Sequence, residues 1–467
     1  MRGVQFDSLA WERSDAKYDA WCKKLLPEET MRTVGRFMVK ESEGGLATEL
    51  TIPQAGGFNA CLKMDFQNSA SLLIRFPQPG IVRFPEEKIR REVAVMRCVA
   101  DSTAIPVPFV LRFGMSDEGP AGLGPFILME YIRHARNMSA VLNTPRLKKE
   151  DRPILDPHIL EMTLKLAYSE MANVLLQLSR PSFSQVGSIE ELEDGSWSVA
   201  HRPLSMNMNQ LVSVGNLPPN TLPSTAFETA FSYFQTLANT NFTHLSIQRN
   251  DAIESAEDCR YKYIARHLFR RIISEKQFPT TPVIGPKPFK LFCDDFRPSN
   301  VLVDENNKIV GVIDWEFTYA APAEFAYSPP WWLLLEPPED WPHGILDWSK
   351  EYEPKLRIFL KALKERENSM INNGQLREDE RLSMRMQESW DTGDFWVAYA
   401  ARKSWAFDVV FWLMINPNPR FFKKPEYEEA LKLLSQEERD GMEEFVQRKM
   451  KEMEEHTLVD WEETTKS

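Results

Sequence analysis

The segment LFCDDFRPSNVLV (residues 291–303) is followed closely by GVIDWE (residues 311–316). Each segment contains a short apolar run, and the turn sequence DENN (residues 304–307) lies between them. Short apolar runs separated by turn residues are typical of buried strands joined in a hairpin. We therefore expect a hairpin whose two strands place Asn300 and Asp314 at the same end.

Three polar side chains in these segments suit the transfer of a phosphoryl group. Asp295 and Asn300 lie in a loop between apolar runs, and Asp314 follows the second strand. In such a transfer one carboxylate orients and deprotonates the attacking hydroxyl group, while an amide and a second carboxylate hold the Mg²⁺ that bridges the phosphates of ATP. Mg²⁺ keeps most of its water ligands, so two protein ligands suffice. Either motif alone could arise by chance, but their order, spacing and flanking strands together favour the functional interpretation.

The combined pattern resembles the catalytic loop and metal motif of the aminoglycoside phosphotransferase and choline kinase superfamily. That family has His-x-Asp-x-x-x-x-Asn followed by Ile-Asp-Trp or Ile-Asp-Phe. The segment around Asp295 together with IDWEF (residues 313–317) is most similar to the large fungal branch of this family. The resemblance implies a two-lobed α+β fold of the protein-kinase type with ATP in the cleft. It also implies that Asp295 is the catalytic base and that Asn300 and Asp314 bind magnesium. Arg297 precedes a proline where related enzymes have a basic residue or histidine, and a cation there would steady the transferring phosphoryl group.

Two positions depart from the family pattern. Cys293 replaces the usual histidine, which braces the loop, and a thiol is smaller and a poor hydrogen-bonding partner. We therefore expect the loop to be held differently. A nucleophilic Cys293 is the alternative, but no Cys–His pairing signature accompanies it. Arg75 occupies a strand position where lysine is usual, and its planar guanidinium would contact phosphate with a different geometry. The two departures leave open an enzyme that is slow or has lost catalysis.

The chain divides into a β-rich first part and a helical remainder. Helical spacing with many charges predicts a helical extension before residue 45, and the rest after residue 130 is mostly helical in pattern. We expect a small nucleotide-binding lobe over residues 1–130 and a large helical lobe with the catalytic loop over residues 131–467. In the first part, strand patterns occupy residues 49–53, 62–66, 71–76 and 126–130, and a helical pattern occupies residues 85–100.

Several residues of the first part are candidates for nucleotide binding. Gly56, Gly57 and Asn59 lie in a turn between strand patterns, where a flexible backbone would approach phosphate. An ordinary hairpin turn is the alternative. By the resemblance, the backbone from Glu130 to Ile132 forms the hinge between the lobes and contacts adenine, with a buried core strand as the alternative.

A buried ion pair is also expected in this part. By the resemblance, Arg75 pairs with a carboxylate on the following helix. Glu92 is the best candidate because apolar residues at helical spacing would turn inward around it. Glu86 and Glu87 are the alternatives that we expect to be exposed.

The composition excludes several classes of protein. Lys and Arg number 56 against 68 Asp and Glu, and the net charge of −12 disfavours nucleic acid as a partner. Five scattered cysteines indicate neither a disulfide framework nor a zinc site, which favours a reducing compartment such as the cytoplasm. Residues 1–20 resemble neither a secretory signal nor a mitochondrial transit peptide, and the longest apolar runs, at residues 331–335 and 409–415, are too short to cross a membrane.

The sequence thus leads to the hypothesis of a Mg-ATP-dependent phosphotransferase acting on a hydroxyl group of a small molecule. A catalytically silent nucleotide-binding scaffold is the main alternative, motivated by Cys293 and Arg75. A protein kinase is less favoured, because no Asp-Phe-Gly follows the hairpin and no Ala-Pro-Glu closes an activation loop. A hydrolase lacks the Gly-x-Ser-x-Gly elbow. Nothing in the sequence indicates which molecule accepts the phosphate.

Overall fold

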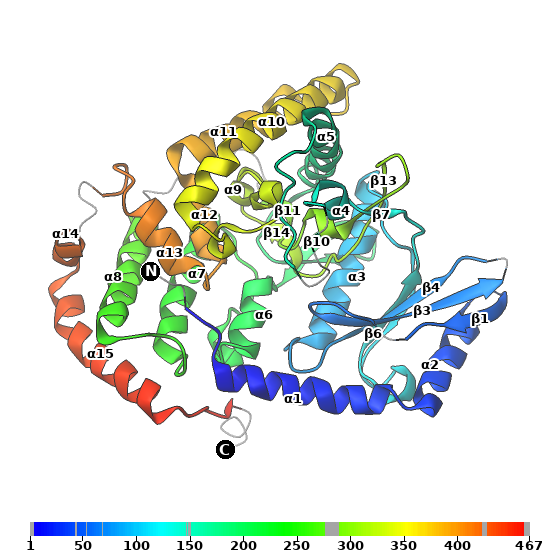
Figure 1. Cartoon of the computed structure of the whole chain (residues 1–467), viewed down its shortest axis with the longest axis horizontal. Coiled ribbons are helices and arrows are strands. Elements are labelled where there is room, and N and C mark those ends of the chain that lie inside the picture. Colours follow the sequence, from blue (N-terminus) through cyan, green and yellow to red (C-terminus); the bar gives the residue numbers. More distant parts are fainter. Residues whose placement is uncertain are drawn as a thin grey trace.

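The structure is a computed structural model. It describes residues 4–42, 44–52, 54–67, 69–145, 147, 151–275, 289–422 and 427–461. An antiparallel sheet with one long helix against it forms most of the first part of the chain, and helices dominate the rest (Figure 1). The α+β class expected from the sequence is confirmed. The boundary between two lobes at residue 130 stays a prediction.

Two helices precede the sheet, as the sequence predicted. The first, α1 (Ser8–Leu25), begins where the Asp7 carboxylate accepts a hydrogen bond from the Ala10 amide at 3.0 Å, a good N-terminal cap. At its other end, the Trp21 indole donates to the Leu123 carbonyl at 2.8 Å beside the sheet. Helix α1 therefore runs along the lower edge of the molecule from the helical part to the sheet (Figure 1), and α2 (Glu28–Glu41) follows it.

The N-terminal sheet has the strand order β1-β3-β4-β6-β5, with β2 added to β3. The first strand begins at residue 46 and not at residue 49 as predicted, and the predicted end at Pro53 lies outside the described residues. The sequence did not predict β5, whose side chains are mostly part-exposed and show little alternation. The strands are β1 (Leu46–Leu50), β2 (Gln54–Ala55), β3 (Asn59–Gln67), β4 (Leu72–Pro77), β5 (Val110–Gly114) and β6 (Phe126–Glu130).

Helix α3 (Pro85–Ser102) joins the sheet to the rest of the molecule. Ile89, Val93 and Met96 are buried as predicted, and they belong to the large apolar core that continues through the helical part. A second, smaller core lies between α1, α2 and the sheet. Because α3 contributes to the large core, its inward face lies between the sheet and the catalytic loop.

The helical part contains long helices and several short ones. In one of the long helices, Glu161–Leu178, the burial of Leu164, Met171 and Val174 marks a single apolar face. Beyond Trp348 helices predominate as predicted, with a π-helical turn at Phe411–Ile415. The α-helices are α4 (Met138–Leu142), α5 (Glu161–Leu178), α6 (Met206–Ser213), α7 (Ala230–Ile247), α8 (Ala256–Ser274), α9 (Ala323–Ala326), α10 (Ile345–Asn372), α11 (Ser383–Thr392), α12 (Asp394–Arg402), α13 (Phe407–Val410), α14 (Tyr427–Lys432) and α15 (Gln436–Glu455).

Small sheets carry the catalytic segments. The predicted hairpin is confirmed: Val301 lies opposite Val312, and the Ile313 amide donates to the Asn300 carbonyl at 2.9 Å. This register brings the ends of the two strands together at Asn300 and Asp314. The strands are β7 (Arg136–Asn137), β12 (Val301–Val303) and β13 (Ile309–Val312) in one sheet, β8 (Ser182–Phe183), β11 (Phe289–Cys293) and β14 (Thr318–Ala321) in another, and the hairpin β9 (Ser188–Glu191) and β10 (Trp197–His201).

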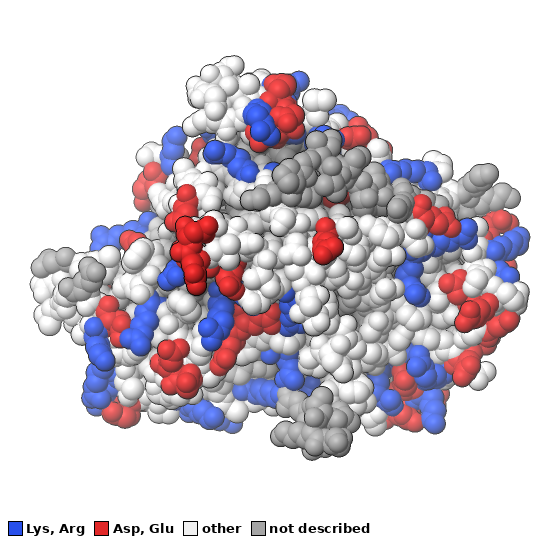
Figure 2. Space-filling view, turned by 180° about the vertical axis from the view of Figure 1, so that it is seen from behind, with Lys and Arg blue, Asp and Glu red and all other residues white. Residues whose placement is uncertain are grey.

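The surface charges are mixed in sign. Figure 2 shows acidic and basic side chains interspersed over the face opposite to that of Figure 1, with no broad basic patch on that face. Among the described residues, no helix is both long and apolar enough to cross a membrane.

Candidate active site

A cavity of about 370 Å³ lies between the N-terminal sheet and the catalytic loop. Its walls come from the turn before β3, from β4 and α3, from the end of β6, and from the segments around Asp295 and Asp314. The structure thereby brings together residues that lie far apart in the sequence. Of the predicted site residues, those that line the cavity are Gly56, Gly57, Asn59, Arg75, Glu92, Glu130, Ile132, Asp295, Arg297 and Asp314.

Asp295 is fixed by hydrogen bonds from its own loop. The Asn300 amide nitrogen donates to the Asp295 carboxylate at 3.0 Å and to its carbonyl oxygen at 2.9 Å, so Asn300 lies directly beside the cavity wall. Arg297 Nε lies 3.0 Å from the other carboxylate oxygen. Burial raises the pKa of Asp295 to about 6, against the opposing charge of Arg297. A carboxylate with this pKa is ionised at neutral pH and accepts a proton more readily than an exposed one.

Asp314 occupies a strained position at the end of the hairpin. Its backbone is left-handed, with φ at +58°, a conformation that aspartate tolerates better than most residues. Its carboxylate accepts a hydrogen bond from Arg75 Nη1 at 2.6 Å, yet 31% of the side chain is exposed, on the side that faces the cavity. Burial raises the pKa of Asp314, while the Arg75 charge opposes that rise. The carboxylate is therefore both anchored and accessible.

The ion pair predicted between Arg75 and Glu92 is present. The Arg75 guanidinium contacts the Glu92 carboxylate, and both side chains are almost completely buried. The two alternatives lie elsewhere: Glu86 accepts hydrogen bonds from Ser116, and Glu87 pairs with Arg202. Glu92 is thus the glutamate that α3 directs toward the cavity.

Two further charged residues, Lys88 and Glu316, complete this cluster, and neither was among the residues predicted from the sequence. Lys88, one helical turn before Glu92, forms an ion pair with Glu316. Glu316 lines the cavity, and the Asn59 amide nitrogen donates to its carboxylate at 2.9 Å. Burial alone would raise the pKa of Glu316, but the charges of Lys88 and Arg75 hold it below its usual range. A signal existed, because Lys88 shares the inward helical face of Glu92.

The glycine turn is open to the cavity. A Cβ atom added to Gly57 would meet no heavy atom within 4 Å, and at Gly56 the nearest would be the Asn59 carbonyl at 3.6 Å. The turn is held from outside, because Gln78 Nε2 donates to the carbonyls of Gly56 at 2.8 Å and Asn59 at 2.9 Å. A bound phosphate could approach this backbone closely, whereas the Asn59 side chain is already engaged by Lys88 and Glu316.

The predicted hinge segment forms the opposite wall. The amides of Glu130 and Tyr131 donate to carbonyls of Phe109 and Ser71, both at 2.9 Å. Ile132 packs against Gly311, where a Cβ atom would lie 2.5 Å from Ile132 Cδ1, so a larger residue would displace this wall. The neighbouring lining is apolar and suits a flat base: Leu73, Met96, Met129, Leu302 and Ile313. That adenine binds here stays a prediction.

In the family pattern a histidine braces the catalytic loop, and here other contacts hold it. Cys293 is buried, burial raises the pKa of its thiol to about 12, and its sulfur lies 4.0 Å from the Asp314 carbonyl. An inert thiol of this kind disfavours the nucleophile alternative. The neighbouring Asp294 instead pairs with Arg402 of α12 at 3.5 Å, and the Arg402 guanidinium lies between the rings of Phe292 and Phe325. The sequence contained no signal for this distant partner.

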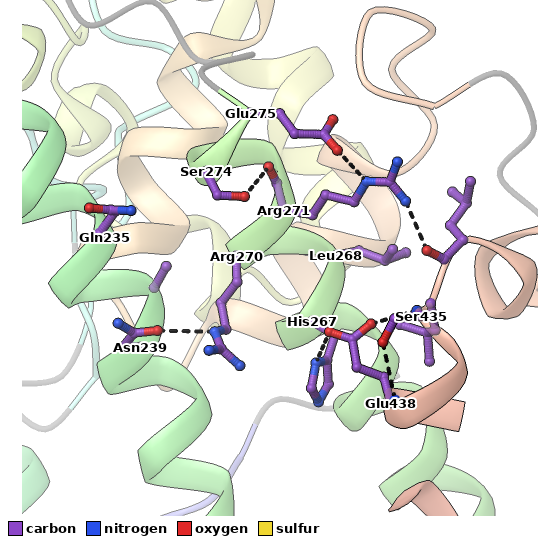
Figure 3. A pocket seen from close by; sticks show the side chains of 13 residues that line it. Gln235, Asn239, His267, Leu268, Arg270, Arg271, Ser274, Glu275, Ser435 and Glu438 are labelled. Carbon is purple, nitrogen blue, oxygen red and sulfur yellow. Dashed lines mark hydrogen bonds and ion pairs between the residues drawn. The ribbon is translucent and has the colours of Figure 1, made fainter. Parts of the chain in front are cut away.

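A larger cavity of about 660 Å³ lies between α7, α8 and the start of α15 (Figure 3). Its polar side chains bind one another: Arg270 donates to Asn239 at 3.0 Å, and His267 contacts Glu438 at 2.7 Å. None of the predicted site residues lines it. Across the described part of the chain, no group of three or more His, Cys, Asp or Glu side chains is arranged so that it could hold a metal ion by itself.

Comparisons with known proteins give the following matches. Aminoglycoside phosphotransferase APH(4)-Ia, solved with ADP and hygromycin B, is similar at 13% sequence identity and a TM-score of 0.42, over 81% of this chain and 98% of that chain. An ethanolamine kinase of Plasmodium vivax is similar at 12% identity and a TM-score of 0.41, over 91% of this chain and 85% of that chain. Macrolide 2′-phosphotransferase type I is similar at 12% identity and a TM-score of 0.40, over 80% of this chain and 96% of that chain. No curated protein matches the chain. Residues 218–349 match the model of a family described as "Phosphotransferase enzyme family".

The matched segment contains β11 to β14 and therefore Asp295, Asn300 and Asp314. Over residues 218–349, the resemblance of this chain to the phosphotransferase enzyme family is confirmed.

Proposed function

We propose that this protein is a kinase that transfers the γ-phosphoryl group of ATP to a hydroxyl group of a small molecule. The observation that carries the proposal is a single cavity that joins Asp295 and Asp314 to Arg75, the open glycine turn and the apolar wall at Ile132. A nucleotide in this cavity would have its base at the apolar wall and its phosphates between the turn and Asp314. The family match over residues 218–349 supports this function.

The proposed reaction uses Asp295 as general base. Its carboxylate accepts the proton of the acceptor hydroxyl group as the oxygen attacks the γ-phosphorus. A new P–O bond forms to the acceptor, the bond between the γ-phosphorus and the bridging oxygen breaks, and ADP leaves with the electron pair. Asn300 and Arg297 keep the carboxylate oriented, because each contacts one of its oxygens. Arg297, which is 46% exposed, also supplies positive charge near the transferring group.

The donor set fits a magnesium ion held together with the nucleotide. The accessible Asp314 carboxylate and the Asn300 amide oxygen would hold it, since Asn300 directs its nitrogen toward Asp295. When bound, the ion would neutralise charge on the ATP phosphates.

Transfer of γ-phosphate from labelled ATP to a panel of small alcohols, amino alcohols and sugars tests this function. The wild-type protein with Mg²⁺ should label at least one acceptor, and Asp295→Asn should reduce that rate about 10²–10⁴-fold, as expected for loss of a general base. Folding of the variant is checked by circular dichroism. An unchanged rate in Asp295→Asn, or no transfer to any acceptor, would contradict the proposal.

A nucleotide-binding scaffold without catalysis is the second candidate. Two observations favour it: Arg75 occupies the Asp314 carboxylate, and Cys293 stands in place of the bracing histidine. Such a scaffold would bind nucleotide but would transfer no phosphoryl group, either to small molecules or to peptides. The same panel, extended to peptide substrates, thus separates the scaffold, the small-molecule kinase and the protein kinase.

Three finer assignments belong to the proposal as well. The segment around Asp295 supports a place in the large fungal branch of the family, and the scattered cysteines support a cytoplasmic location. The acceptor is a small molecule that carries a hydroxyl group.

A further inference from the structure

Lys88 is a buried cation at the junction between the sheet and the catalytic loop. Its side chain is 1% exposed, although it lies on α3 among charged neighbours in the sequence. An ammonium group has three N–H donors and is costly to bury unless all of them are bound. Here the Lys88 ammonium contacts three acceptors: the Glu316 carboxylate, the Asn59 amide oxygen at 2.8 Å and the Glu92 carboxylate at 3.4 Å. Its position is therefore fully specified.

The three acceptors come from three different parts of the site. Asn59 begins β3 directly after the glycine turn, Glu92 is the partner of Arg75, and Glu316 follows Asp314 by two residues. Lys88 itself does not line the cavity, whereas all three acceptors do. One ammonium group thus positions the turn, the ion-pair partner and the metal-loop carboxylate from behind the cavity wall.

The charge balance of the cluster depends on Lys88. Two cations, Arg75 and Lys88, face the three carboxylates of Glu92, Asp314 and Glu316. Without Lys88 the guanidinium of Arg75 would be the one cation of the cluster among these three anions. Unpaired buried carboxylates would then attract Arg75 away from Asp314 and from the phosphates of a nucleotide.

We propose that Lys88 is a positioning residue that holds Asn59, Glu92 and Glu316, so that Arg75 remains available to the nucleotide phosphates. This inference rests on the proposed function, and it adds a second cation to the single strand cation that the sequence predicted. The two basic residues thus have different roles. Arg75 faces the cavity, whereas Lys88 neutralises the carboxylates of Glu92 and Glu316 from outside the cavity.

The test compares Lys88→Met with a matched control, Lys262→Met. Lys262 on α8 is equally buried, pairs with Asp258 and donates to the Ala252 carbonyl at 3.0 Å, but it does not line or contact the cavity residues named above. Each variant is titrated with ATP and Mg²⁺ while its melting temperature is recorded, and the dissociation constant is derived from the concentration dependence. We expect both variants to lose stability, and Lys88→Met alone to bind nucleotide about tenfold to 100-fold more weakly.

Two further variants keep the test informative if Lys88→Met does not fold. Lys88→Arg retains the charge and should recover part of the affinity, and Glu316→Gln retains an acceptor for Lys88 and should weaken binding less than Lys88→Met. Once an acceptor is known, the kinetics of Lys88→Met give a further test. KM for ATP should rise more than kcat falls, which a purely structural defect would not produce.

The outcomes separate the inference from the proposed function. Wild-type protein without any nucleotide-dependent shift contradicts both. A normal shift in wild type that is equally retained in Lys88→Met contradicts the role of Lys88 and leaves the proposed function standing. If Lys88→Met does not fold, an affinity of Glu316→Gln equal to that of wild type, or an affinity of Lys88→Arg no higher than that of Glu316→Gln, contradicts it as well.

Discussion

Two buried arginine–carboxylate pairs in this molecule differ in one respect. In the helical part, Arg266 of α8 pairs with Asp408 of α13, and both side chains are completely buried. Its guanidinium also donates to the carbonyls of Asn241 at 2.9 Å and Lys262 at 3.1 Å, and it lies 4.9 Å from the centre of the Phe407 ring. This pair is closed on every side.

The pair in the candidate site is open on one side. Arg75 contacts Glu92 and Asp314, but among the described residues its Nε has no hydrogen-bond partner, and Asp314 faces a cavity. A buried donor without an acceptor costs free energy, so this pair is less completely satisfied than the pair of Arg266 and Asp408. In this molecule, therefore, it is access from a cavity that distinguishes the pair of the candidate site from the pair that only stabilises the fold.

Arg266→Met should have the largest effect on stability. The substitution leaves the Asp408 carboxylate buried without its cation, which costs about 3–5 kcal/mol of unfolding free energy. Urea unfolding followed by tryptophan fluorescence measures the loss. The double variant Arg266→Met/Asp408→Leu should recover most of it, and the remaining folded protein should still bind nucleotide. A loss below about 1 kcal/mol would show that this pair is not the structural contact described here.

Asp295→Asn should change stability in the opposite direction. Because burial raises the pKa of Asp295 to about 6, ionisation of this group is unfavourable in the folded state and destabilises the protein above pH 6. At pH 7 the variant should therefore be more stable by about 1–3 kcal/mol. The difference should shrink as the pH falls from 6 toward 4, and it disappears only below the ordinary aspartate pKa, where the carboxyl group is protonated in both states.

Unfolding midpoints of wild type and Asp295→Asn between pH 4 and pH 7.5 measure this difference. Asp408→Asn is the matched control, since it removes a carboxylate from the closed pair and should lose stability at neutral pH. If Asp295→Asn is less stable than wild type at pH 7, ionisation of the buried Asp295 carboxyl group does not destabilise the fold, which contradicts the prediction.

Much of the site could be predicted because it is local in sequence. The catalytic loop and the metal motif lie on one hairpin, so spacing and apolar runs were enough to place Asn300 beside Asp314. Burial of Glu92 followed from helical periodicity alone. These features depend on the backbone and on short-range pattern.

The contacts that the sequence did not reveal are long-range. Lys88 finds Glu316 only after α3 packs against the catalytic hairpin, and Arg402 reaches Asp294 from a helix far along the chain. A lysine or arginine within a charged helix is normally exposed. Lys88 shares a helical face with Glu92, which indicates burial, but no local pattern identifies Glu316 as the partner of Lys88 or Asp294 as the partner of Arg402. Tertiary packing decides that choice.

Arg402→Gln should have the smallest of these effects. The variant removes the cation that holds Asp294, so the catalytic loop loses its brace while the nucleotide walls stay intact. We expect kcat to fall about tenfold with KM for ATP within about twofold of wild type, because misplacement of the base affects chemistry more than nucleotide binding. Steady-state kinetics with the best acceptor measures both constants. A rise in KM for ATP as large as the fall in kcat would contradict the bracing role.

The central claim is that the cavity between the sheet and the catalytic loop binds nucleotide together with a metal ion. Calorimetric titration of ATP into the wild-type protein and into Asp314→Ala, each with and without Mg²⁺, tests it most directly. The account predicts saturable binding to wild type that Mg²⁺ strengthens, and loss of the Mg²⁺ effect in Asp314→Ala. Absence of binding to wild type, or an equal Mg²⁺ effect in the variant, would contradict it.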